Sequence, residues 1–276
     1  MEVFLKQANP LNLLKNSLTP SRGVNTDNFT LFNSELGIFD LAGQENKNWF
    51  STDTEIFENS DIILCVFDIN NSLEEIISFL VRLLKIKKKT STLSNCNIMT
   101  FLHKIDLVSS SYIAHKVKAL KTFFKEHYPL GLDIKVFATS IAKEFFYRTY
   151  MIIVDCLNLI IKEGLIPISD KQFNLLKKDL FIILETQSSK RYDINNLSKR
   201  LKLNKKYLYF HLKRLERLGF LEFIAESGEL FQFTKRCEFF KEGFQKEINK
   251  VEKIKKEEKF PLFKTFQQLY NVPMRI

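Results

Sequence analysis

The sequence predicts an α/β fold with a doubly wound, mostly parallel sheet, followed by a second domain of helices and a short hairpin. Apolar segments of strand length alternate with amphipathic helical segments over residues 1–165. Short polar motifs follow several of the strand segments, and this is where such sheets bind ligands. Positive charge is concentrated after residue 170. We therefore expect domains at 1–165 and 170–240, with a charged helix and tail at 241–276.

The charge balance separates the two parts of the chain. All 276 residues together carry 42 Lys+Arg and 32 Asp+Glu, a net charge of +10. Residues 171–276 hold 24 of the basic and 13 of the acidic side chains, so this region alone has an excess of eleven positive charges. Such a bias bears on partners, such as nucleic acid or an anionic membrane surface, rather than on fold.

The four cysteines indicate a reducing compartment. Cys65, Cys96, Cys156 and Cys237 are far apart in the sequence and form no CxxC pair. Neither a disulfide framework nor a zinc site is indicated. The sequence shows no signal peptide, and its apolar stretches are too short or too interrupted to span a bilayer. We expect a cytoplasmic protein.

The elements of the first domain follow from apolar patterning. Two short runs at 29–32 and 36–39, joined by a polar turn, predict a hairpin. The continuous apolar run at 61–69 is typical of a strand covered on both faces. Ser72 and Glu75 have the spacing of a capping box and open a helix. Further strands are predicted at 97–102 and 134–138, and further helices at 111–127 and 144–162.

Two motifs follow predicted strands. Residues 40–44 read DLAGQ, which has the form DxxGQ, and residues 103–106 read HKID, which has the form [N/T/H]KxD. Taken alone each is weak, because an Asp after a strand is usually a turn former and KxD occurs by chance in a lysine-rich chain. Their order and their strand context together make a chance origin a poor explanation.

With these motifs, the first domain resembles a small GTPase of the Ras superfamily, with its P-loop NTPase fold. The His of HKID, together with Thr139-Ser140-Ile141 after a later strand, makes it most similar to the Rag/Gtr family. The resemblance covers residues 1–165. It implies a nucleotide-dependent regulatory switch that binds GTP or GDP with Mg²⁺, contacts a protein effector or regulator, and forms a Rag-like dimer.

The resemblance assigns the phosphate side of the site to residues near the hairpin. The irregular loop at 19–24 corresponds to a first switch, in which Ser21 would ligate Mg²⁺ in place of the usual Thr. Asp40 would hold Mg²⁺ directly or through water, since a hard dication prefers oxygen ligands. The amide of Gly43 would approach the γ-phosphate, and Gln44 would orient the attacking water. Residues 45–59 would form a polar second switch.

The resemblance assigns the base side to residues after two later strands. Asp106 would accept hydrogen bonds from guanine N1 and N2, which adenine cannot supply, so the wrong base would leave a buried carboxylate unpaired. Lys104 would pack along the base, and His103 stands where Asn is usual. The backbone of Thr139, Ser140 and Ile141 would meet guanine O6.

One part of the pattern is missing. A P-loop reads GxxxxGK[ST], and no Gly-Lys pair occurs anywhere in the sequence. We expect the strand and loop to be encoded in frame upstream of Met1, and the chain as printed to bind GTP weakly and to be marginally folded in its first half. GTP hydrolysis is expected only if that loop is supplied. A nucleotide-free pseudo-GTPase scaffold is the alternative.

The C-terminal part resembles a winged helix of archaeal transcription regulators. Helices are predicted at 171–187, 194–201 and 205–218, with strands at 220–224 and 229–233 and a long final helix. The resemblance lies in YLYFHLKRLERLGFLEF, residues 207–223. One face of the helix at 205–218 gathers basic and aromatic side chains: Lys206, Tyr209, Phe210, Lys213 and Arg217.

This face has two interpretations. A cationic helix face could enter a DNA major groove, which would make the protein a DNA-binding regulator. An exposed Phe210 beside Tyr209, and acidic residues in the hairpin, favour contact with a protein partner. The sequence leaves both open.

Overall fold

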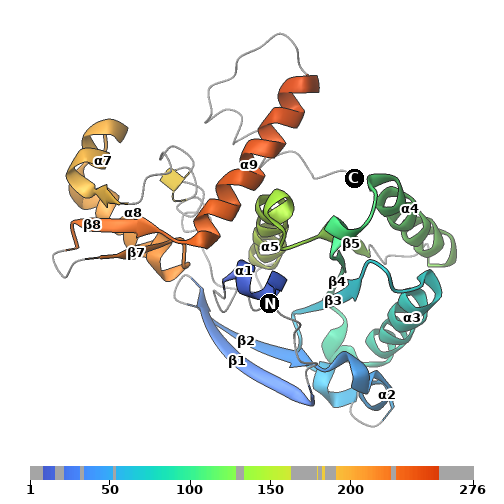
Figure 1. Cartoon of the computed structure of the whole chain (residues 1–276). Coiled ribbons are helices and arrows are strands. Elements are labelled where there is room, and N and C mark those ends of the chain that lie inside the picture. The colour runs from blue at the N-terminus through green and yellow to red at the C-terminus, as the bar shows by residue number, and fades with distance from the viewer. Residues whose placement is uncertain are drawn as a thin grey trace. The chain divides into compact units, whose positions relative to one another are not determined.

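A computed structural model describes residues 9–15, 22–31, 34–51, 54–128, 134–162, 179, 182–183, 191–224 and 228–254. The chain divides into two compact units. The sheet unit comprises Leu18–Ser140 and Asp155–Pro167, and the helical unit comprises Met1–Ser17, Ile141–Val154 and Ile168–Ile276. Figure 1 labels their elements.

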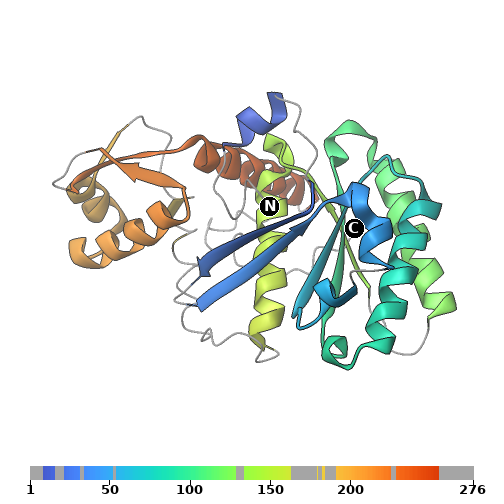
Figure 2. The same ribbon diagram turned by 90° about the horizontal axis from the view of Figure 1, so that it is seen from below.

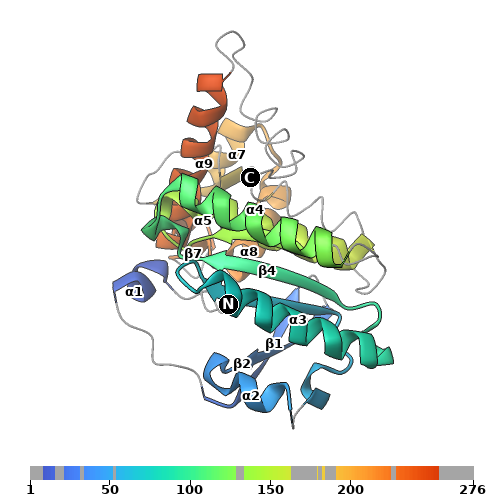
Figure 3. The same ribbon diagram turned by 90° about the vertical axis from the view of Figure 1, so that its right-hand side faces the viewer.

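The sheet unit is built on three parallel strands in the order β3-β4-β5. They are β3 (Ile62–Asp68), β4 (Asn97–His103) and β5 (Lys135–Thr139). The crossover helices α3 (Leu73–Lys89) and α4 (Ser110–His127) lie side by side against one face of this sheet (Figures 1 and 3). The central strand β4 is the most buried, because sheet neighbours flank it on both edges.

Both crossover helices begin where the sequence places N-caps. Ser72 Oγ accepts a hydrogen bond from the Glu75 amide, and the Glu75 carboxylate accepts one from the Ser72 amide, which confirms the predicted capping box. Ser109 caps α4 through the Tyr112 amide. Between the helices and the sheet lies an apolar core of Ile76, Leu80, Leu83, Met99, Leu102, Val117, Leu120 and Phe124.

The predicted hairpin is present and longer than expected. Strands β1 (Val24–Leu31) and β2 (Ser34–Leu41) pair antiparallel from Val24 opposite Leu41 to Leu31 opposite Ser34. Among the described strands they form a two-stranded sheet of their own, seen as the blue pair in Figure 2. Because β2 runs through Asp40 to Leu41, Asp40 lies within the strand and not after its end.

The strand β3 is an edge strand within the described structure, since it pairs only with β4. Its sequence is that of a strand covered on both faces, yet Val66 is 56% exposed and only Cys65 is buried.

The segment at 46–59 contains local structure that polarity did not indicate. It holds α2 (Asn46–Trp49) and a short 3₁₀ turn, η2 (Thr54–Phe57), and it is preceded by another, η1 (Gly43–Glu45). The reason is apolar anchoring, because Trp49 and Phe57 are both buried. Two further 3₁₀ turns, η3 (Ser91–Leu93) and η4 (Ile105–Leu107), flank β4.

The helical unit contains a small antiparallel sheet in the order β6-β8-β7 with helices around it. Its elements are α1 (Pro10–Lys15), the first half of α5 (Lys143–Lys162), β6 (Tyr192–Asp193), α7 (Ile194–Leu201), α8 (Lys205–Arg217), β7 (Leu221–Phe223), β8 (Leu230–Phe233) and α9 (Lys235–Ile254). The predicted helices at 194–201 and 205–218 and both predicted hairpin strands are found here. The predicted helix at 171–187 falls mostly outside the described residues.

The first half of α5 packs closely on α9. A Cβ atom added to Gly243 would lie 2.9 Å from the Tyr147 amide nitrogen and 3.0 Å from the Lys143 carbonyl oxygen, so only glycine permits this approach. Around it lies an aromatic cluster of Phe146, Tyr147, Tyr150, Phe220, Phe239, Phe240 and Phe244. Residues 141–154, expected in the first domain, thus share a core with the C-terminal elements.

Candidate functional site

The loop after β4 holds the HKID motif in a fixed turn. Lys104 adopts the left-handed conformation, with φ 64° and ψ 37°, which costs a residue with a side chain on the order of 1 kcal/mol. The Leu107 amide closes the turn by donating to the Lys104 carbonyl at 3.1 Å. Backbone strain of this kind occurs preferentially at binding sites, so the turn is a candidate site.

The parallel register aligns three polar residues across the carboxyl end of the sheet. Asp68 of β3 lies opposite His103 of β4, and His103 lies opposite Thr139 of β5. Lys104 reaches back to form an ion pair with Asp68, with 2.7 Å between Nζ and Oδ2. Partial burial opposes ionisation of Asp68, but hydrogen bonds from Lys104 and from the Asn70 amide outweigh it and lower the pKa of Asp68.

His103 is a neutral member of this row. Its Nδ1 lies 3.1 Å from the Thr139 hydroxyl oxygen. Burial lowers the pKa of His103 to about 4, and the nearby Lys104 charge acts in the same direction. At neutral pH His103 therefore acts as an uncharged hydrogen-bonding group that joins β4 to β5.

Asp106 is braced from the next strand. The Ser140 hydroxyl donates a hydrogen bond to Asp106 Oδ1, and both Thr139 and Ser140 are almost fully buried. Asp106 itself is half-buried. The chain thus fixes a carboxylate beside the end of β5. Ile141, the last residue of the TSI motif, falls in the helical unit.

A buried lysine missed by sequence reasoning supports the loop after β3. Lys116 of α4 is 5% exposed, and its Nζ donates to the carbonyls of Ile69, at 2.6 Å, and Asn71. These residues directly follow Asp68, so Lys116 holds the segment that positions the partner of Lys104. A lysine on an amphipathic helix looks like any other solvated residue, and no local pattern marked it.

The DLAGQ motif is held by a different set of contacts. The Ala42 amide donates to the Gly23 carbonyl at 3.1 Å, and the Gly23 amide donates to Glu45 Oε1 at 2.8 Å. Trp49 Nε1 donates to the Ala42 carbonyl at 3.0 Å. Gly23 has φ 63°, which favours glycine. These bonds tie the start of β1 to the turn after β2.

The individual phosphate-side residues are less enclosed. Asp40 is exposed on β2, and Gly43 is exposed with nothing within 4 Å of an added Cβ. Gln44 lies in η1. Ser21, the other expected Mg²⁺ ligand, lies outside the described residues. No cluster of His, Cys, Asp and Glu that could hold a metal occurs among the residues that the structure describes.

The donor and acceptor set fits one half of a guanine nucleotide. Asp106, Ser140 and Thr139 supply a half-buried carboxylate and buried hydroxyls beside exposed loop atoms, which suits a base with two N–H donors. The phosphate half does not fit. Asp40 could contribute one Mg²⁺ ligand and Gly43 one amide, but the sequence holds no Gly-Lys pair to neutralise and cradle the phosphates.

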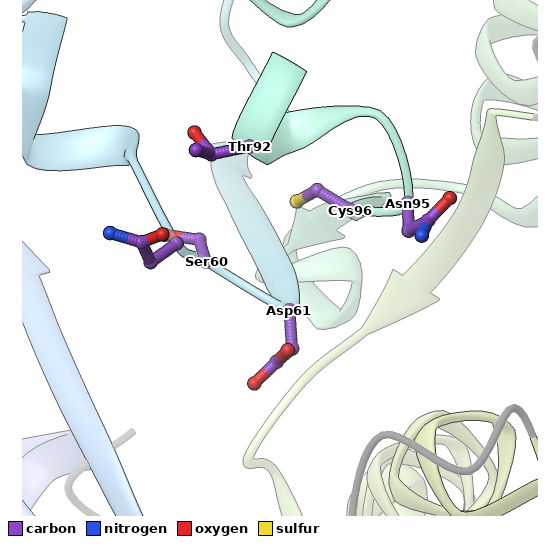
Figure 4. Close-up of a pocket in the computed structure, with 6 residues that line it drawn as sticks. Ser60, Asp61, Thr92, Asn95 and Cys96 are labelled. Atoms are coloured by element: carbon purple, nitrogen blue, oxygen red, sulfur yellow. The ribbon is translucent and has the colours of Figure 1, made fainter. Parts of the chain in front are cut away.

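A pocket of about 300 Å³ lies elsewhere, at the amino ends of β3 and β4. Its lining consists of Asn59, Ser60, Asp61, Thr92, Asn95 and Cys96, most of them labelled in Figure 4. Burial raises the pKa of the Cys96 thiol to about 11, so this cysteine is not a nucleophile at neutral pH. The HKID loop lies at the opposite, carboxyl end of β4.

The predicted face of α8 is only partly exposed. Lys206, Phe210 and Arg217 are exposed, and Phe210 retains 54% of its accessible surface. Tyr209 packs on Phe223 of β7, with 5.8 Å between ring centroids. Lys213 places Nζ 4.3 Å from the centroid of the same Phe223 ring. Two of the five residues therefore contact Phe223 of the hairpin, although the Lys213 side chain stays 38% exposed.

The sequence matches the Gtr1/RagA G protein conserved region over residues 7–204, which is more than half of the chain. The protein therefore belongs to the Gtr1/RagA family of G proteins, small GTP-binding regulators that use guanine nucleotide and Mg²⁺ and work with partner proteins as dimers. The match extends beyond residue 165, where the resemblance was expected to stop. The mixed α/β architecture with a parallel sheet fits a Ras-like P-loop NTPase fold.

No curated protein sequence matches the chain significantly. No helix within the described ranges is long and apolar enough to cross a membrane.

Proposed function

We propose that this Rag-like protein reads the guanine base with the loop after β4 and binds the phosphates poorly in the chain as printed. The observation that carries the proposal is the brace of Asp106 by Ser140, next to the His103–Thr139 contact. A carboxylate held in this way needs little reorganisation to accept two N–H groups. Preorganisation of this kind lowers the entropic cost of binding.

Each base-side residue has a distinct role in this proposal. Asp106 accepts hydrogen bonds from guanine N1 and N2. Lys104, fixed by Asp68, lays its aliphatic stem along the base. His103 keeps β4 and β5 in register, and the backbone of Thr139, Ser140 and Ile141 meets guanine O6.

On the phosphate side, we propose that a phosphate loop is needed before Asp40 and Ser21 ligate Mg²⁺, the Gly43 amide meets the γ-phosphate and Gln44 orients water. Hydrogen bonds link Gly23, Ala42, Glu45 and Trp49. A ligand near Gly43 would therefore change the conformation of the segment at 45–59. That segment would present the surface for an effector, a regulator or a dimer mate. Hydrolysis would require a phosphate loop.

A pseudo-GTPase scaffold is the second candidate. The lack of any Gly-Lys pair in the sequence and the edge position of β3 among the described strands favour it. Loss of several charge-assisted hydrogen bonds, each about 1.5–3 kcal/mol, is enough to reduce tight nucleotide binding to the millimolar range. The two candidates differ in whether any base selectivity remains.

The test is a titration of the chain with GTP and with ATP, each with Mg²⁺, followed by NMR shifts of residues 103–107 and 139–141. We expect GTP alone to shift these signals, at millimolar concentration, and Asp106→Ala to abolish the difference. Asp61→Ala, at the opposite end of the sheet, is the matched control. Equal shifts with both nucleotides would contradict the proposed recognition of the guanine base. Binding of GTP in the micromolar range would contradict the proposed weak binding of the phosphates.

A chain extended upstream to include a P-loop should prefer GTP over ATP strongly, and Asp106→Ala should remove that preference with little change in thermal stability of the nucleotide-free form. An in-frame stop close upstream of Met1, with no such loop encoded, would promote the pseudo-GTPase candidate.

A further inference from the structure

The helical unit has a surface whose exposed aromatic side chains have no role in nucleotide binding. Phe210 is 54% and Tyr207 is 42% exposed on α8. Residues three apart on a helix are neighbours, so these two rings share one face. Tyr207 also packs edge-on against the buried His211, which fixes one side of the patch.

The surroundings of this patch are basic. Lys206 and Arg217 lie on the same exposed side of α8, four residues before and seven residues after Phe210. The end of α7 and the turn after it add three exposed cations, Lys199, Arg200 and Lys202. The single acidic residue of α8, Glu216, is paired with Lys213 at 3.0 Å. The patch thus has an apolar centre and a positive rim.

The contacts favour a protein partner over DNA. Lys213, which belongs to the predicted basic face, lies over the Phe223 ring and forms an ion pair with Glu216. The hairpin also carries an exposed carboxylate at Glu222, which repels phosphates, whereas Glu229 is paired with Lys205 at 2.8 Å. The residue at the centre of the exposed face is Phe210, and aromatic residues together with Arg are enriched at the centre of protein interfaces.

We propose that the face of α8 formed by Lys206, Tyr207, Phe210 and Arg217 docks an acidic amphipathic helix of a partner protein. The apolar side of that helix covers the two rings, and its carboxylates face the basic rim. This mode places apolar anchors at i, i+3, i+4 and i+7 of the partner helix. The surface is independent of nucleotide binding, so it stands whether or not the base site does.

The probe is a labelled 18-residue peptide designed as an amphipathic helix. Leu stands at positions i, i+3, i+4 and i+7, repeated along the peptide, and Glu stands at all other positions. A second peptide has the same composition in scrambled order, and a 20-base-pair duplex DNA is the third ligand. Binding to the full chain is measured by fluorescence anisotropy at low and at moderate salt. We expect the amphipathic peptide to bind at least about tenfold tighter than the scrambled one, since only it presents an apolar stripe.

Variants separate the apolar centre from the rim. Phe210→Ser should lower the affinity for the amphipathic peptide about tenfold or more, as truncation of a central aromatic anchor does. The double variant Lys206→Glu, Arg217→Glu should lower this affinity further at low salt. It should also remove the salt dependence of binding. The controls are Tyr112→Ser, which replaces an exposed aromatic on α4, and Lys88→Glu, which replaces an exposed lysine on α3. Both variants should bind the peptide with an affinity within about twofold of that of the unmodified chain.

Circular dichroism checks that every variant is folded, and Phe210, Lys206 and Arg217 are all exposed residues outside the buried core. Tighter binding of the duplex than of the amphipathic peptide, with loss in the charge variants but not in Phe210→Ser, would assign the face to DNA and overturn the proposal. Equal binding of both peptides, or no binding of either, would also overturn it.

Discussion

The loop after β4 and the turn after β2 both belong to the proposed nucleotide site, but they are supported differently. The loop after β4 follows the central strand of a three-stranded sheet and receives contacts from both neighbours, Asp68 on one side and Ser140 on the other. The turn after β2 belongs to a two-stranded sheet, which is marginally stable by itself. The sheet thus holds the loop that is proposed to recognise the base from two sides, whereas the residues proposed to meet the phosphates depend on a few local hydrogen bonds.

The largest expected effect concerns the buried lysine that supports the base side. Lys116→Met should destabilise the protein by about 2–4 kcal/mol, since the carbonyls of Ile69 and Asn71 lose a shared donor in a buried place. Urea unfolding measures it. Lys118→Met, on the exposed side of α4, should change stability by less than about 0.5 kcal/mol. Equal effects from the two changes would mean that Lys116 is not buried as described.

A pH effect should come from His103. Its pKa falls from 6.5 to about 4 on burial, so the unfolded chain binds more protons between these values and acid destabilises the fold. The contribution of uncharged His103 to the free energy of unfolding is fully present above about pH 6.5. It is lost toward pH 4 and amounts to roughly 1–3 kcal/mol. Thermal unfolding at several pH values measures the slope. His103→Asn should flatten it, and an unchanged slope in that variant contradicts the assignment.

The phosphate side should respond more weakly. Trp49→Phe removes the hydrogen bond to the Ala42 carbonyl and should cost about 1–2 kcal/mol. Hydrogen exchange should show the loss confined to residues 40–50, with residues 103–107 protected as before. Exchange that rises equally in both regions would refute the separation between the two halves of the site.

The smallest effect compares two buried threonines of adjacent strands. Thr100 Oγ1 has no hydrogen-bond partner among the described residues, so Thr100→Val should be neutral or stabilising by up to about 1 kcal/mol. Thr139→Val breaks the contact with His103 and should cost about 1 kcal/mol. The sign of the difference between the two variants, read from thermal unfolding, checks the contact.

Local signals explain which parts of the fold and site could be predicted. Ser72 and Glu75 act through neighbouring backbone groups, so their capping box was visible in sequence. The element order and the HKID loop followed from periodicity. Lys116 and the Asp68–Lys104 pair depend on residues 36 to 47 positions apart, and only the parallel register brings such residues together.

The C-terminal face illustrates the same limit. Helical periodicity grouped Lys206, Tyr209, Phe210, Lys213 and Arg217 on one face of α8, and none of these five is among the buried residues of this helix, Leu208, His211, Leu212 and Leu215. It could not show that Phe223 would cover Tyr209 and Lys213, since that depends on how the hairpin folds back. The close approach of α9 to α5 at Gly243 was likewise invisible, because a helical glycine has no local signature.

The central claim is that this chain retains the base half of a guanine-nucleotide site without an effective phosphate half. The most direct test compares guanosine with GTP in the presence of Mg²⁺, with adenosine as the specificity control, by NMR titration. We expect guanosine and GTP to bind within about threefold of each other, both in the millimolar range, because the phosphates gain few charge-assisted bonds. Adenosine should not bind, and Asp106→Ala should remove both signals. GTP binding more than about a hundredfold tighter than guanosine, a difference near 2.7 kcal/mol, would contradict the account.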